Sequence, residues 1–105
     1  ASVQALVLPM TADPAPAIAL AEALRTGGLR VQLYGENKKF KQKMSYADKL
    51  GVPFAVLLGE DEISAGKCSV KDMRSGEQQL LTPEEAVGYL TERLNRDAGT
   101  VIQEK

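Results

Sequence analysis

VLLGEDE, at residues 56–62, is an apolar run that ends in three consecutive carboxylates. KCSVKDMRSGEQ follows at residues 67–78, and its first half alternates apolar with polar side chains. The apolar run predicts a buried strand over residues 53–58, which is central in its sheet because both of its faces are apolar. The second run predicts a hairpin with strands over residues 67–73 and 77–81. Gly76 is expected to supply the positive φ that a three-residue hairpin loop requires.

Outward from this block, strand patterns alternate with helical ones. Further strands are expected over residues 3–9 and 30–34, and three helices over residues 14–26, 38–50 and 83–96. This order predicts an α/β domain with a mixed, mainly parallel five-stranded sheet. Right-handed crossovers make the first three strands parallel, and the hairpin adds an antiparallel edge. Helices are expected on both faces of the sheet.

The helix ends and faces carry their own predictions. Asn37 is expected to cap the second helix, and Thr82 with Glu85 forms a capping box at the start of the third. The second helix has apolar residues at helical spacing, which we expect to pack on the sheet: Phe40, Met44, Ala47 and Leu50.

Length and composition restrict the classes of protein that fit. The chain has 105 residues, one cysteine and no histidine, which excludes an internal disulfide, a zinc-site spacing and histidine-dependent catalysis. We expect one domain over residues 1–96 and a flexible tail over residues 97–105, where apolar content is low. Cys68 is expected in the core. Because the chain opens on a strand without an initiator Met, we expect a piece of a larger protein.

The cellular setting follows from the same features. A lone free cysteine favours the reducing cytoplasm. No apolar run approaches the roughly 18 residues of a membrane span, so no membrane partner is expected. No Gly-rich phosphate loop occurs, so we expect no nucleotide cofactor.

Charge is distributed unevenly along the chain, although the net charge is −1. Residues 25–49 hold seven basic groups against two acids, whereas residues 77–105 hold six acids against three bases. Four lysines crowd the first turns of the second helix, where the helix dipole does not favour cations: Lys38, Lys39, Lys41 and Lys43. This pattern suits phosphate contact, and a solvated lysine-rich helix would also explain it.

Glu60, Asp61 and Glu62 follow the carboxyl end of a parallel strand, where open α/β sheets bind ligands. A solvated acidic turn, a magnesium site or acid–base chemistry are all compatible with three carboxylates in this position. A carboxylate can also accept hydrogen bonds from the Watson–Crick edge of an unstacked guanine, which is a usual means of reading single-stranded RNA.

Four segments carry a specific resemblance: NKKFKQ (37–42), ADKLG (47–51), LGEDE (58–62) and VKDMRSGEQ (70–78). They resemble the anticodon-binding domain of class II aminoacyl-tRNA synthetases, and most of all the C-terminal domain of its histidyl members. The resemblance covers about residues 3–94. It implies a module that binds tRNA, here the anticodon loop of histidine tRNA, within a larger ligase.

In this family, anticodon contacts come from the turn into the second helix, from the last acid after the third strand and from a basic residue on the next strand. The resemblance therefore implies RNA-binding roles at five positions of this chain: Asn37, Lys38, Lys39, Glu62 and Lys71. Threonyl members tend to carry Arg at the position of Lys71. Because Lys lacks the planar guanidinium fork, its role is expected to shift toward a phosphate or a single acceptor.

The class II catalytic motifs are absent, so the resemblance implies a domain that is not itself an enzyme and needs no cofactor. The ligase around it would use ATP and magnesium elsewhere and would be a homodimer. Two alternatives stay open: a synthetase-like regulatory domain that senses uncharged tRNA or mediates dimerisation, and a small flavodoxin-like enzyme. The second is disfavoured because the chain lacks a phosphate loop, histidine and a metal cluster.

Overall fold

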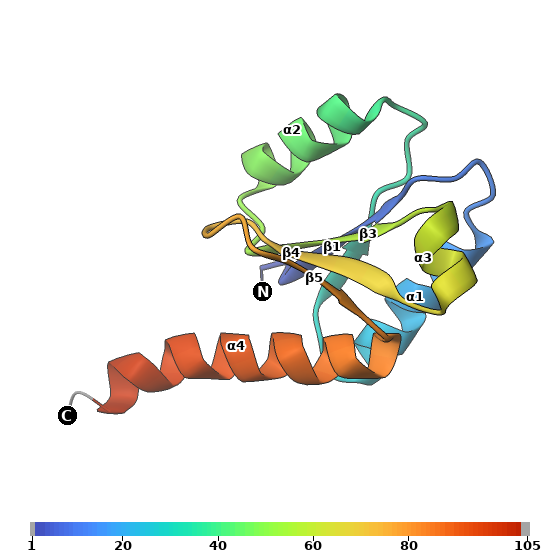
Figure 1. Cartoon of the computed structure of the whole chain (residues 1–105). Helices are drawn as coiled ribbons and strands as arrows, with labels where there is room; N and C mark the ends of the chain where they lie inside the picture. Colours follow the sequence, from blue (N-terminus) through green and yellow to red (C-terminus); the bar gives the residue numbers. More distant parts are fainter. Residues whose placement is uncertain (1, 104–105) are drawn as a thin grey trace.

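The computed structural model describes the backbone of residues 2–103 and the side chains of residues 2–97. Strands and helices alternate along most of the chain (Figure 1). In chain order they are β1 (Ala5–Pro9), α1 (Ala15–Thr26), β2 (Val31–Leu33), α2 (Phe40–Leu50), β3 (Phe54–Leu58), α3 (Glu60–Ala65), β4 (Cys68–Asp72), β5 (Gln78–Leu81) and α4 (Pro83–Gln103).

The strands form one sheet in the order β2-β1-β3-β4-β5. β1 pairs in parallel with β2 and with β3, whereas β4 pairs antiparallel with β3 and β5 antiparallel with β4. All five residues of β3 are buried, as expected of a central strand. The predicted α/β class and the mixed five-stranded sheet are confirmed.

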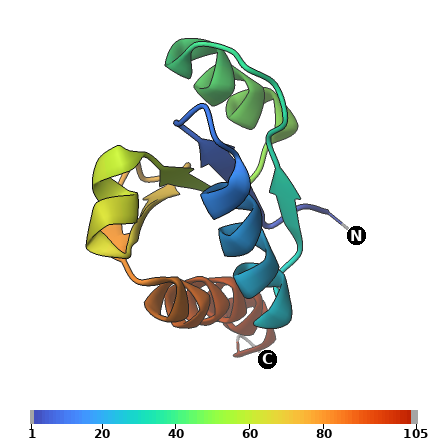
Figure 2. The ribbon, with the colours of Figure 1, turned by 90° about the vertical axis from the view of Figure 1, so that its right-hand side faces the viewer.

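Helices cover both faces of the sheet, with α1 and α4 on one side and α2 on the other (Figures 1 and 2). Alternate residues of β3 supply the two cores, because successive side chains of a strand point to opposite faces. Phe54, Val56 and Leu58 pack with α1 and α4. Ala55 and Leu57 pack with Ala47 of α2. Among the described helices, α2 is the one that covers the face toward which Ala55 and Leu57 point.

Residues 2–103, whose backbone the structure describes, form four helices, so the prediction of three was wrong. α3 begins directly after β3 and places Glu60, Asp61 and Glu62 in its first turn, where the helix dipole favours negative charge. Glu62 Oε1 accepts a hydrogen bond of 2.6 Å from the Gly59 N–H, which satisfies a backbone donor at the helix start. Gly66 ends the helix with a φ of 68°, in the left-handed region that glycine adopts readily.

Two predicted helix ends also differ from the structure. α2 starts at Phe40 with Lys39 as its N-cap residue, so Asn37 does not cap it. The Lys39 N–H instead donates to Gln42 Oε1 over 3.2 Å. α4 runs through to Gln103, and its backbone is therefore helical well past the expected end at residue 96. Residues 104–105 of the expected tail lie outside the described residues, and the domain boundary itself stays a prediction.

Other local predictions are confirmed. The Thr82 N–H donates to Glu85 Oε1 over 2.9 Å, and the Glu85 N–H donates to Thr82 Oγ1 over 3.1 Å, which is a capping box. Cys68 is fully buried in the α1–α4 core. Burial, with a smaller contribution from Glu62, raises the pKa of the Cys68 thiol to about 11.

Within the described residues, no helix has the length and apolar character needed to cross a membrane.

Candidate nucleic-acid interface

β4 presents two chemically different faces. Its buried residues Cys68 and Val70 point to the α1–α4 core, while Ser69 and Lys71, which alternate with them along the strand, point the other way. In the sheet register Lys71 lies between Ala55 and Gln78, and Ser69 lies between Leu57 and Leu80. The part of this face on β4 and β5 is open to solvent, since Leu80 is 52% exposed. We call Ser69, Lys71, Gln78 and Leu80 the β4–β5 platform.

α2 lies on the sheet by only part of the apolar stripe that its sequence predicts, because Ala47 is buried and Met44 packs against the same core. Phe40 is 50% exposed and Leu50 is also exposed, whereas Ala47 and Lys43 are buried. The Lys43 ammonium donates a hydrogen bond of 2.5 Å to the Pro9 carbonyl at the end of β1. A lysine can be buried in this way because its long apolar stem packs while its ammonium reaches an acceptor. The prediction that Phe40 belongs to the core was therefore wrong.

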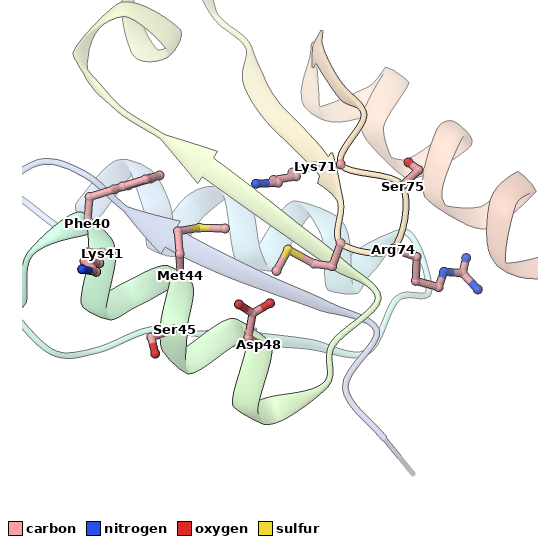
Figure 3. Close-up of a pocket in the computed structure, with 10 residues that line it drawn as sticks. Phe40, Lys41, Met44, Ser45, Asp48, Lys71, Arg74 and Ser75 are labelled. Carbon is pink, nitrogen blue, oxygen red and sulfur yellow. The ribbon is translucent and has the colours of Figure 1, made fainter.

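A hollow of about 690 Å³ separates α2 from β4 and the following turn. Residues from both sides line it: Phe40, Lys41, Met44, Ser45, Asp48, Lys71, Met73, Arg74, Ser75 and Gly76. Figure 3 shows Phe40, Met44 and Asp48 directed from α2 into this space and Lys71 extending from β4 toward them. Because residues four apart lie on one face of a helix, these three α2 side chains form one row opposite Lys71.

The turn that borders the hollow is fixed from beneath by Asp72, which is 4% exposed. Asp72 Oδ1 accepts hydrogen bonds from the Arg74 N–H (2.9 Å) and the Ser75 N–H (3.2 Å). Its Oδ2 lies 3.4 Å from Nη1 of Arg93 on α4. Arg93 also reaches Glu77 over 3.2 Å and stacks 4.7 Å above the centre of the Tyr89 ring.

Asp72 and Arg93 were absent from the predicted site, although one signal could have identified the first of them. Strand alternation places Asp72 on the buried face with Cys68 and Val70, and a buried carboxylate requires a cationic or hydrogen-bonding partner. A second link joins the same turn to α4, because Arg74 Nη2 lies 2.6 Å from Asp97 Oδ2. The shape of the turn thus depends on α4, from the opposite face of the sheet.

Four of the five predicted RNA-binding residues lie toward one end of the sheet. β2 and β3 are parallel to β1, so the loop after β2 and the helix after β3 leave the sheet at the same edge (Figure 1). Asn37, Lys38 and Lys39 are exposed in that loop. Lys38 Nζ lies 3.8 Å from Glu36 Oε1 across a solvent-exposed pair. Glu62 is half-buried at the start of α3.

Lys71 stands apart from these four residues. It pairs with Ala55, three residues before the end of β3 at Leu58, which is about 10 Å along the strand. Glu62 lies beyond that end, so one small ligand does not reach both side chains. An extended chain can contact both, as it passes from the sheet edge across the β4–β5 platform.

The arrangement suits binding better than catalysis. Within the part of the chain that the structure describes, no group of three or more Cys, Asp or Glu side chains could hold a metal ion. Exposed lysines can bind the phosphates of a single-stranded nucleic acid, and an exposed aromatic ring can stack on its bases. A carboxylate with a free oxygen adds an acceptor for base N–H groups.

Comparison with known proteins agrees with this geometry. The family model described as "Anticodon binding domain" matches residues 4–93. The chain belongs to the family of anticodon-binding domains. The resemblance drawn from the sequence motifs is thereby confirmed at the level of the family.

Individual relatives of this anticodon-binding domain are ligases. The histidine–tRNA ligase of Bacteroides fragilis is 45% identical over 67 residues, which are 64% of this chain and 15% of the ligase. The histidine–tRNA ligase of Clostridium tetani is 42% identical over 84 residues, which are 80% of this chain and 19% of the ligase. The domain thus spans less than a fifth of the length of these two relatives.

Solved structures share the fold of the domain. Histidyl-tRNA synthetase from Nostoc sp. PCC 7120 matches with a TM-score of 0.83 and 32% identity, over 90% of this chain and 23% of that one. The RNA-binding domain of threonyl-tRNA synthetase from Cryptosporidium parvum matches with a TM-score of 0.79 and 20% identity, over 86% of this chain and 23% of that one. At the lower identity the likeness concerns the fold alone.

Proposed function

We propose that this anticodon-binding domain is the C-terminal part of a histidine–tRNA ligase and binds the anticodon loop of histidine tRNA. The observation that carries the proposal is the open face beside α2, where the exposed Phe40 and the half-buried Lys71 border a hollow of about 690 Å³. The histidine–tRNA ligases among the relatives favour this parent over a regulatory protein.

In the proposed mechanism, the loop bases unstack and spread from the sheet edge onto the β4–β5 platform. Lys38 and Lys39 bind phosphates at the edge, because both are exposed at the start of a helix that carries further lysines. Asn37 orients a base through its amide. Lys71 binds a phosphate or one base acceptor, since a single ammonium cannot form the bidentate contact of an arginine.

Glu62 is the proposed reader of a guanine edge. Its Oε1 is held by the Gly59 N–H over 2.6 Å, which orients the carboxylate and leaves Oε2 to accept from base N–H groups. Glu60 and Asp61 are exposed in the same turn and complement the helix dipole without a comparable anchor. An anchored acceptor binds more tightly than a free one because it loses less entropy on binding, and its fixed direction matches only bases with a donor in the right place.

The surrounding ligase would hold the chemistry. ATP, magnesium and histidine would bind outside this domain, the ligase would act as a homodimer, and it would work in the cytoplasm. This domain would contribute affinity and anticodon selectivity and would not itself activate an amino acid.

Glu62→Gln tests the proposed reading role without removing the helix cap. The glutamine carbonyl can still accept from the Gly59 N–H, while its NH₂ group presents donors where a guanine needs an acceptor. We expect affinity for a histidine-tRNA anticodon stem–loop to fall roughly ten-fold, with little loss for stem–loops of altered anticodon. Fluorescence anisotropy against stem–loops altered one base at a time measures both affinities.

Lys39→Ala is the companion variant, because a phosphate contact carries no base information. It should weaken binding to all stem–loops by similar factors and should lower the salt dependence by about 0.7 in the log–log slope. If Glu62→Gln and Lys39→Ala both bind every stem–loop as the wild type does at low salt, the assignment of these residues is wrong.

A further inference from the structure

Phe40 is a large apolar side chain that the fold does not bury. It is the first residue of α2, it is 50% exposed, and it stands between Lys39 and Lys41. Exposing an aromatic ring to water forgoes hydrophobic stabilisation that burial would provide. Figure 3 shows the ring reaching over the hollow toward Lys71 of β4. A half-exposed ring beside lysines is a surface on which a nucleobase can stack.

We propose that the hollow between α2 and the β4–β5 hairpin holds one unstacked nucleotide of the bound RNA, with Phe40 stacking on its base and Lys71 binding its phosphate. The inference rests on the proposed function, because the RNA loop is the partner proposed there. It adds a nucleotide site on α2 to the contacts expected at the sheet edge and on β4.

The size and lining of the hollow fit such an occupant. Its volume of about 690 Å³ falls within the range of roughly 300–1,000 Å³ found for small-ligand sites. Met44 and Met73 line it beside Phe40, and methionine sulfur packs well against flat aromatic groups. A base can therefore contact apolar groups on both sides, as stacked bases do in single-strand-binding proteins.

The charges around the hollow orient the nucleotide. Lys71 extends toward Phe40, whereas Asp48 directs its carboxylate into the hollow from farther along α2 (Figure 3). A phosphate is attracted to the end near Phe40 and Lys71 and repelled from the end near Asp48. The same charges disfavour a purely apolar protein segment, which would offer no counter-charge to two lysines that line the hollow, Lys41 and Lys71.

The test uses the 105-residue chain and a histidine-tRNA anticodon stem–loop that carries 2-aminopurine at each loop position in turn. Stacking on an aromatic ring changes the fluorescence of this base analogue. We expect one loop position to respond when the wild type binds and to lose that response with Phe40→Leu, while affinity falls roughly five- to a hundred-fold. Phe40→Trp keeps an aromatic ring and should retain the response.

Ile18→Ala is the matched control, since Ile18 is 47% exposed on α1, on the other face of the sheet. It should leave affinity and fluorescence unchanged. If the wild type binds the RNA but no loop position responds to Phe40→Leu, the nucleotide site is wrong while the proposed function stands, and the hollow suits another occupant such as a protein segment. If the wild type does not bind the RNA, both proposals are overturned.

Discussion

Asp72→Ala is expected to lower the melting temperature of the chain by roughly 10–20 °C. The Asp72 carboxylate is almost fully buried, accepts two turn N–H groups and faces the Arg93 guanidinium at 3.4 Å. Removing it leaves a partly buried cation and two turn donors without their acceptor, at a cost of about 2–3 kcal/mol. For a domain of this size each kcal/mol corresponds to about 4–8 °C. Thermal unfolding followed by circular dichroism measures the change.

Two further variants make this prediction specific. Asp72→Asn keeps an oxygen for the Arg74 and Ser75 N–H groups but loses the charge that faces Arg93. Its melting temperature should therefore fall by about half as much as that of Asp72→Ala. Asp61→Ala removes an exposed acid at the start of α3. Because only its interaction with the helix dipole is lost, the free energy of unfolding should fall by at most about 1 kcal/mol. A melting temperature for Asp72→Ala that equals that of Asp61→Ala would show that the turn is held by other contacts.

Lys71→Glu is expected to weaken binding of a histidine-tRNA anticodon stem–loop by roughly 30- to 150-fold, which corresponds to about 2–3 kcal/mol. The substitution removes a cation from the centre of the β4–β5 platform and places a carboxylate opposite the RNA phosphates. Lys71 lies on the open face beside Gln78, so the fold should be retained. Anisotropy titrations at fixed low salt measure the affinity.

Lys49→Glu is the control for Lys71→Glu because it changes the net charge equally. Lys49 is exposed and lines a different depression, with Tyr34 and Tyr46. Lys49→Glu should act on RNA binding only through long-range electrostatics, which salt screens. The affinity should therefore change by no more than about three-fold. Equal losses for the two variants would mean that the RNA responds to overall charge and does not contact the platform.

Much of the fold could be predicted because its signals are local. The parallel arrangement of the first three strands follows from helical segments between apolar runs. The hairpin follows from alternation up to a glycine, and Gly76 does adopt a φ of 80°. The start of α4 follows from the capping box of Thr82 and Glu85, whose two hydrogen bonds the structure contains.

The errors lie where competing local patterns have similar strength. α3 has six residues, too few for periodicity to distinguish it from a turn. On α2, Phe40 and Lys43 are three residues apart and so lie only about 60° apart around the helix axis, and hydrophobicity favours burying Phe40. The fold buries Lys43 instead, because its ammonium reaches the Pro9 carbonyl, a contact between residues far apart in the sequence.

The candidate site was predictable only in part for the same reason. Exposed positions such as Lys39 can be placed on a loop by the turn that precedes the helix. The ion pair of Asp72 with Arg93 joins residues from different elements across the sheet, and a single sequence does not specify such a partner. Neither does it specify that Phe40 and Lys71 face each other across a hollow, which depends on the rotation of α2 about its axis.

Binding of the wild-type chain to the anticodon stem–loop of histidine tRNA tests the central claim most directly. The titration should be run beside a stem–loop of the same stem and loop length with all anticodon bases replaced, at several salt concentrations. We expect at least roughly ten-fold tighter binding to the histidine anticodon, with both affinities falling as salt rises. Equal affinity for the two stem–loops, or no binding to either, would contradict the proposed function.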